Sequence, residues 1–163
     1  MNNIIKRDLY LQRLIERKEN GLIKIITGIR RCGKSFLLFN LFHDYLVESG
    51  IKKDHIITIA LDDDTCVKYR DPEELSKYVR EQIKNDEMYY ILIDEVQYAI
   101  TKEELRNPEE IKLYNVLNGL MRLRNVDIYI TGSNSKMLTR DVLTVFRGRG
   151  DEVKIHPISF REY

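Results

Sequence analysis

Residues 28–35 read Gly-Ile-Arg-Arg-Cys-Gly-Lys-Ser, which is a complete Gly-x-x-x-x-Gly-Lys-Ser phosphate loop. The run 22–26, which is apolar except for Lys24, precedes it and the apolar residues 36–39 follow it. The motif therefore has the strand before it and the helix after it that phosphate binding requires. Gly28 and Gly33 allow the backbone to turn successive N–H groups onto phosphate oxygens, and the start of the next helix adds partial positive charge. This stretch predicts a nucleoside triphosphate site in an α/β domain.

The loop combines a backbone cradle with two side chains that have separate tasks. We expect Lys34 to reach the β- and γ-phosphates and to serve catalysis, and the Ser35 hydroxyl to bind Mg²⁺. The residues expected to bind the nucleotide are Gly28, Ile29, Arg30, Arg31, Cys32, Gly33, Lys34, Ser35 and Phe36.

Strand and helix signals alternate along the chain, which favours one α/β domain over residues 1–163 with a mainly parallel sheet. We expect helices at residues 7–19, from the phosphate loop to about residue 49, at residues 107–124, and through residues 137–138. The expected strands are residues 22–26, 55–61, 89–93, 127–131 and 153–156.

A further helix is predicted from its capping residues. Asp71 is a good N-cap, Pro72 suits the first turn, and Glu74 stands where a capping box needs it. Asn107, Pro108 and Glu110 repeat this device at the start of the helix over 107–124. The predicted buried stripe of the earlier helix is Leu75, Val79 and Ile83.

Two acidic residues end the third predicted strand. A carboxylate at Asp94 lies at the carboxyl edge of the sheet, where ligands bind in open α/β sheets, and can hold Mg²⁺ through water. Glu95 follows it and can orient or deprotonate the water that attacks the γ-phosphate. The plainer alternatives are an acidic pair that merely ends a strand, or an inert surface acid at Glu95.

The fourth predicted strand ends in Thr-Gly-Ser-Asn-Ser at residues 131–135. Ser133 or Asn134 can hydrogen-bond the γ-phosphate or the catalytic water, and we prefer Asn134. Both residues are also favoured N-caps, so simple helix capping stays an alternative.

Two arginines, Arg147 and Arg149, can supply positive charge to a phosphate in the same chain or a neighbouring subunit, although surface arginines are often only solvated. Residues 62–64 are three aspartates at the same sheet edge, and we interpret them as a solvated acidic loop.

The composition is that of an ordinary globular domain of 163 residues, with 43% hydrophobic and 33% charged residues. A net charge of +1 gives no support for nucleic-acid or membrane binding. Cys32 lies in the phosphate loop, where a disulfide would distort the geometry, so we expect a reducing cytoplasm. No apolar stretch approaches 18 residues, no signal peptide is apparent, and the histidines lack metal-ligand spacing.

Four stretches resemble the prokaryotic AAA-type ATPases of the archaeal-ATPase-like class, in which an N-terminal ATPase domain precedes a domain of unknown function. The exact sequence of the phosphate loop and the Pro-x-Ser-Phe-x-Glu motif at residues 157–162 are more specific than a generic nucleotide-binding motif. The matching stretches are residues 25–35, 93–97, 130–133 and 157–162.

The resemblance implies a P-loop NTPase core of three layers, α/β/α, in which the sensor strand separates the phosphate-loop strand from the Asp-Glu strand. It carries over Lys34, Ser35, Asp94 and Glu95 as nucleotide and Mg²⁺ residues, and Arg149 as the arginine of the family's Gly-Arg pair. It also implies adenine over guanine, and no Asn-Lys-x-Asp guanine motif occurs. No C-terminal lid follows, so we expect this chain to be a piece of a longer protein, and we expect hydrolysis by this piece alone to be slow or undetectable.

Three functions follow from these residues. The leading one is a Mg²⁺-dependent ATPase that drives a conformational switch or motor, with ATP and ADP as its ligands. The alternative is a nucleotide-dependent binding module with negligible hydrolysis, and a small-molecule phosphotransferase is disfavoured by Glu95. A second copy of the chain, and a protein or DNA partner bound through a region beyond residue 163, stay open as partners.

Overall fold

The computed structural model describes residues 2–28, 33–107, 110–132 and 150–155. Its centre is a five-stranded sheet with the order β2-β3-β4-β1-β5, and every strand pair in it is parallel. The strands are β1 (Ile23–Thr27), β2 (Ile56–Ala60), β3 (Tyr89–Asp94), β4 (Val126–Gly132) and β5 (Gly150–Lys154).

Helical segments connect these strands. The segments α2, η1 and α3 follow one another without a break, and η1 is a π-helical stretch inside that helix. The remaining η segments are short 3-10 helices. The bounds are α1 (Asn2–Arg17), α2 (Lys34–Phe36), η1 (Leu37–Phe42), α3 (His43–Glu48), η2 (Lys53–His55), η3 (Asp64–Arg70), α4 (Pro72–Gln82), η4 (Val96–Ala99), α5 (Lys102–Leu105) and α6 (Lys112–Met121).

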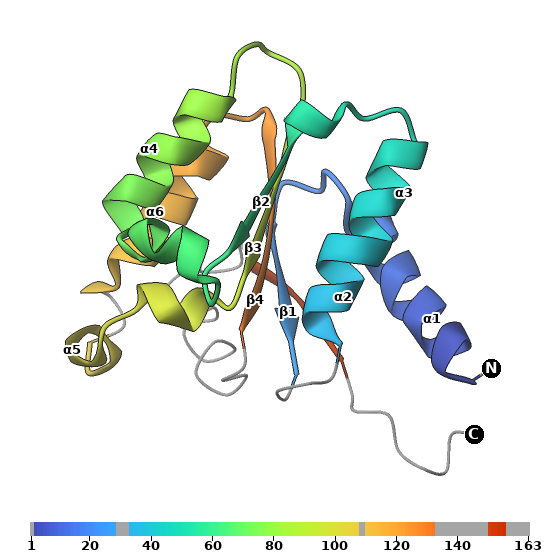
Figure 1. Cartoon of the computed structure of the whole chain (residues 1–163), viewed down its shortest axis with the longest axis horizontal. Helices are drawn as coiled ribbons and strands as arrows, with labels where there is room; N and C mark the ends of the chain where they lie inside the picture. Colours follow the sequence, from blue (N-terminus) through green and yellow to red (C-terminus); the bar gives the residue numbers. More distant parts are fainter. Residues whose placement is uncertain (1, 29–32, 108–109, 133–149, 156–163) are drawn as a thin grey trace.

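The helices cover both faces of the sheet, as Figure 1 shows. One face packs on α4 and α6, and the other packs on α1 and the α2–α3 helix. Strands β1, β3 and β4 are buried on both faces. Successive side chains of each strand point to opposite faces of the sheet, and a layer of helices covers each face. The three-layer α/β fold and the central place of β4, between β3 and β1, are as expected.

Several details differ from expectation, among them the last strand, which is β5 (Gly150–Lys154) and not residues 153–156. Asp71 does cap α4, but its Oδ1 accepts from the backbone N of Glu73 (3.0 Å), and the Glu74 carboxylate lies 3.5 Å from Lys68 Nζ instead of completing a box. α1 begins at Asn2 instead of residue 7. α6 begins at Lys112 instead of residue 107, because the separate helix α5 places Glu104 Oε2 2.8 Å from the Lys112 backbone N. The helix expected through residues 137–138 lies outside the described residues.

The amino edge of the sheet holds a buried ion pair. Lys24 in β1 and Asp127 in β4 are in direct contact, and their side chains are 0% and 2% exposed. Asp127 Oδ2 also accepts from the Tyr129 hydroxyl (2.6 Å) and from the backbone N of Glu19 (2.8 Å). Lys24 Nζ also donates to Asn20 Oδ1 (3.1 Å). Burial lowers the pKa of Lys24, and the attraction of Asp127 opposes this effect.

None of the described helices has both the length and the apolar character that crossing a membrane requires.

Candidate nucleotide site

The phosphate loop leaves the carboxyl end of β1 and enters the helix that starts at Lys34. Gly33 stands just before that helix in the left-handed region, at φ 93°, which favours glycine. Lys34 is 4% exposed, and its Nζ donates to the Gly28 carbonyl oxygen at 2.9 Å. The ammonium group therefore lies back across the loop, where a phosphate group is expected to bind.

Ser35 and Asp94 meet at the edge of the sheet. The Ser35 hydroxyl donates to Asp94 Oδ2 at 2.6 Å, and the Thr131 hydroxyl donates to Asp94 Oδ1. Asp94 is 3% exposed. Burial raises the pKa of Asp94, the two hydroxyl donors counter this effect, and the nearby charges of Glu95 and Asp62 add to it.

Glu95 follows Asp94 in a left-handed conformation, φ 58° and ψ 55°, which ends β3 and starts η4. Its backbone N–H donates to Thr131 Oγ1 at 3.0 Å, and its carboxylate Oε2 accepts from Gln97 Nε2. A conformation this uncommon outside glycine is held by its surroundings, and such residues concentrate at functional sites.

An open cleft with a volume of about 290 Å³ lies beside these groups. The described residues that line it are Gly33, Lys34, Ser35, Phe36 and Glu95. A hydroxyl and a carboxylate in contact are the protein groups that hold Mg²⁺ in phosphate-loop sites, where phosphate oxygens and water supply the other ligands. Ser35 and Asp94 fit this ion, and Lys34 fits the charge of the phosphates.

Among the described residues, four of the side chains expected at the site lie near one another, namely Lys34, Ser35, Asp94 and Glu95. Asp94 lies behind Ser35, and Glu95 lines the same cleft as Lys34. The aspartates at 62–64 are exposed, as expected, and Asp63 caps η3. The expected residues Ile29, Arg30, Arg31, Cys32, Ser133, Asn134, Arg147 and Arg149 lie outside the described residues.

Two side chains at the site were not singled out from the sequence. Thr131 contacts both acidic residues from β4, and Gln97 contacts the Glu95 carboxylate. The sequence did contain a signal for Thr131. It is a hydroxyl residue near the end of the strand beside β3, and a hydroxyl group there can reach the carboxylate of Asp94 at the end of β3.

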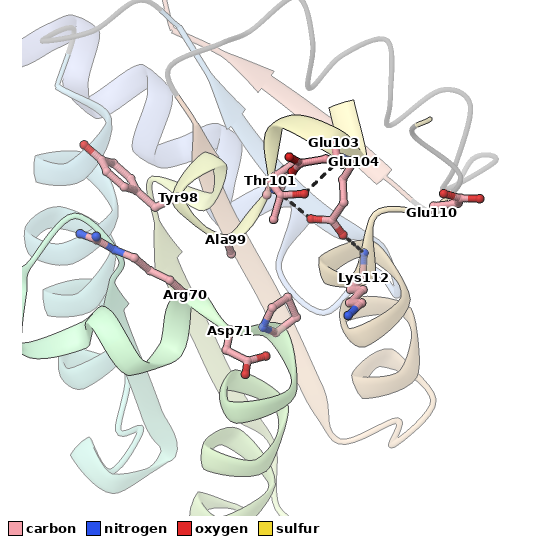
Figure 2. Close-up of a pocket in the computed structure, with 11 residues that line it drawn as sticks. Arg70, Asp71, Tyr98, Ala99, Thr101, Glu103, Glu104, Glu110 and Lys112 are labelled. Atoms are coloured by element: carbon pink, nitrogen blue, oxygen red, sulfur yellow. Dashed lines mark hydrogen bonds between the residues drawn. The ribbon is translucent and has the colours of Figure 1, made fainter. Parts of the chain in front are cut away.

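A larger cavity, of about 630 Å³, opens between η3, α4, η4, α5 and α6. Figure 2 shows Arg70 and Tyr98 on one side of it and Lys112 and Glu110 on the other. The guanidinium carbon of Arg70 lies 4.7 Å from the centre of the Tyr98 ring. Of the phosphate-loop residues that the structure describes, Gly28 and residues 33–35, none lines this cavity, although Tyr98 belongs to the turn that starts at Glu95.

A glycine loop between β1 and a helix, with a strand-end carboxylate against its serine, defines a P-loop domain of the ATPase type. The chain belongs to the AAA domain family, whose family model matches residues 20–163.

Two curated relatives match almost the whole chain. An uncharacterized protein of Haemophilus influenzae is 34% identical over 161 residues, which cover 98% of this chain and 37% of that protein. An uncharacterized protein of Methanocaldococcus jannaschii is 29% identical over 164 residues, with 98% of this chain and 31% of that protein covered. This chain therefore spans about a third of the length of these relatives.

Three solved structures illustrate the shared fold. AMPPCP-bound DnaA from Aquifex aeolicus has a TM-score of 0.57 at 20% identity, with 93% of this chain and 45% of that chain covered. Drosophila ORC bound to GC-rich DNA and Cdc6 has a TM-score of 0.58 at 14% identity, with coverage of 99% and 60%. The Walker-type ATPase of Pyrococcus abyssi has a TM-score of 0.55 at 18% identity, with coverage of 96% and 54%. At these identities the likeness concerns the fold.

Proposed function

We propose that this chain binds ATP with Mg²⁺ and hydrolyses the terminal phosphate, and that hydrolysis changes the conformation of the domain. The observation that carries the proposal is the cleft in which Glu95 lies together with Lys34 and Ser35, with Asp94 directly behind the serine hydroxyl.

Binding relies on Lys34 and the backbone of the loop. Nζ of Lys34 exchanges its contact with the Gly28 carbonyl for a phosphate oxygen, which keeps the buried charge paired. Ser35 and Asp94 would hold Mg²⁺, and the bound ion would neutralise charge on the phosphates. Because burial favours the protonated form of Asp94, a cation beside it would favour the ionised form that binds metal.

Hydrolysis relies on Glu95. A water oxygen attacks the γ-phosphorus in line with the leaving oxygen of ADP, the bond between phosphorus and that oxygen breaks, and the proton of the water passes to the Glu95 carboxylate. The products are ADP and inorganic phosphate.

Thr131 connects this chemistry to the sheet. Its single hydroxyl donates to Asp94 and accepts from the backbone of Glu95, and its strand β4 pairs with β1 on the other side. If Asp94 or Glu95 moves when the γ-phosphate is lost, its hydrogen bond to Thr131 would therefore transmit the movement to β4.

The test uses paired variants. We expect Lys34→Ala to abolish ATP binding and Glu95→Gln to keep binding but stop phosphate release. Glu103→Gln serves as the matched control, because Glu103 is an exposed acid outside the cleft. Equal loss of binding in both variants would contradict the roles. If ATP binds the unmodified chain and is not cleaved in a single-turnover measurement, the binding-module alternative replaces hydrolysis.

DNA is not included in this proposal. The Drosophila ORC structure is bound to DNA, whereas a net charge of +1 adds no electrostatic support for DNA binding by this chain. The rate of ATP hydrolysis measured with and without duplex DNA tests whether DNA takes part. A higher rate with DNA would show that DNA has to be included.

A further inference from the structure

The carboxylate of Glu95 is held by a residue of its own turn. Gln97 lies two positions further along, and its side-chain amide donates to Glu95 Oε2. This contact forms across the left-handed backbone of Glu95 and the first residues of η4. An amide donor fixes one carboxylate oxygen, so the direction in which the second oxygen faces the cleft is also restricted.

The turn itself is held from outside the cleft by a closed set of contacts. The Glu95 carbonyl accepts from the backbone N of Tyr98 at 3.2 Å, and the Asp94 carbonyl accepts from the backbone N of Leu61 at 3.2 Å. Arg70 joins these two segments, because its Nε donates to the Leu61 carbonyl at 2.7 Å while its guanidinium lies over the Tyr98 ring.

The carbonyl groups of Asp94 and Glu95 therefore both accept a backbone hydrogen bond. Arg70 contacts the two residues that donate these bonds, Leu61 and Tyr98. The guanidinium lies at the larger cavity and not in the phosphate cleft (Figure 2). A planar cation stacked on an aromatic ring while it donates to a carbonyl is a role that lysine fills poorly.

We propose that Gln97 and Arg70 are positioning residues for Glu95, Gln97 by orienting the carboxylate and Arg70 by holding the turn that carries it. The inference rests on the proposed ATP hydrolysis. It assigns neither residue a contact with the nucleotide, so both act on turnover and not on binding. A misplacement of the reacting groups of about 1 Å is enough to cost on the order of a hundredfold in rate.

The experiment compares Gln97→Met and Arg70→Ala with matched controls. Methionine keeps the length of glutamine without its hydrogen-bond donor, and Gln82→Met and Arg122→Ala make the same changes at α4 and just after α6. We expect each test variant to lower the kcat of ATP hydrolysis roughly tenfold to a hundredfold, with KM and the affinity for ATP close to those of the unmodified chain. Gln97→Asn restores part of the rate because it returns a donor, whereas Arg70→Lys restores little.

A second measurement is independent of turnover. The side-chain amide protons of Gln97, assigned by their loss in Gln97→Met, should change chemical shift in Glu95→Gln. Unchanged shifts, unchanged kcat in the test variants, or a parallel loss of ATP affinity would each overturn the positioning role. Absence of hydrolysis in the unmodified chain would instead overturn the proposed function on which the inference rests.

Discussion

The buried pair of Lys24 and Asp127 gives a sharp prediction about stability. Asp127→Asn keeps the shape of the side chain and removes its charge, so the variant tests electrostatics without opening a cavity. An amide oxygen can still accept from Tyr129, but Lys24 Nζ, with a side chain that is 0% exposed, loses its counter-ion and keeps Asn20 as a neutral acceptor.

The expected magnitude follows from leaving one charge buried and unpaired. Removing one partner of a buried pair costs about 3 to 5 kcal/mol in free energy of unfolding, of a total of about 5 to 15 kcal/mol for a domain. With an m-value of about 2 to 3 kcal/mol per molar urea, the midpoint should fall by roughly 1 to 2.5 M. Urea unfolding monitored by circular dichroism measures this shift of the midpoint.

The loss should also depend on pH with a definite sign. Burial lowers the pKa of Lys24 below its ordinary value of 10.5, and the charge of Asp127 opposes this. In the variant that opposition is gone, so the unfolded chain binds more protons than the folded one and stability rises with pH. The deficit relative to the unmodified protein should therefore shrink as pH rises from neutral toward 10.5.

Two comparisons make this reasoning refutable. Asp86→Asn changes an exposed aspartate and should leave stability within about 0.5 kcal/mol of the unmodified value. Adding Lys24→Met to Asp127→Asn removes the stranded charge and should recover most of the loss. A loss below about 1 kcal/mol in the single variant, or a double variant no more stable than the single one, would refute the argument.

Three further outcomes are expected. Ser35→Ala should raise the Mg²⁺ concentration needed for half-maximal hydrolysis by about tenfold or more, since the hydroxyl beside Asp94 is lost, and a Mg²⁺ titration measures this. Thr131→Val should destabilise the fold by about 1 to 3 kcal/mol in urea unfolding and slow turnover, because the backbone N–H of Glu95 loses its acceptor. Glu104→Ala should cost about 1 kcal/mol through the uncapped start of α6, whereas Glu103→Ala, next to it and exposed, should change thermal unfolding little.

The sheet was predictable because its central strands are apolar on both faces. Residues 89–93 have no polar side to suggest an exposed surface, and a strand of this kind belongs inside a parallel sheet. The phosphate loop marked the carboxyl edge, and Asp94 followed from the end of its strand. These are local signals, each contained within a few neighbouring residues.

The parts that were not predicted depend on contacts between distant residues or on unusual backbone. Thr131 reaches Asp94 across 37 positions, and only the pairing of β4 with β3 brings them together. The contact of Gln97 with Glu95 requires a left-handed residue at a position occupied by glutamate, a residue type that gives no hint of it. α5 escaped notice because its Thr101 and Glu104 capping box encloses a helix too short to show an apolar period.

The central place of β4 restricts where this chain can gain or lose residues. Thr131 is aligned with Ile26 of β1 on one side of β4, and Ile130 is aligned with Ile93 of β3 on the other. Successive side chains of a strand point to opposite faces, so one inserted or deleted residue within β4 would turn Thr131 away from Asp94 and bury a different side chain in its place. The turn between α6 and β4 tolerates such a change more readily, since Leu123 and Arg124 there are exposed. In homologues, variation in length is therefore expected before Val126 and not between Val126 and Gly132.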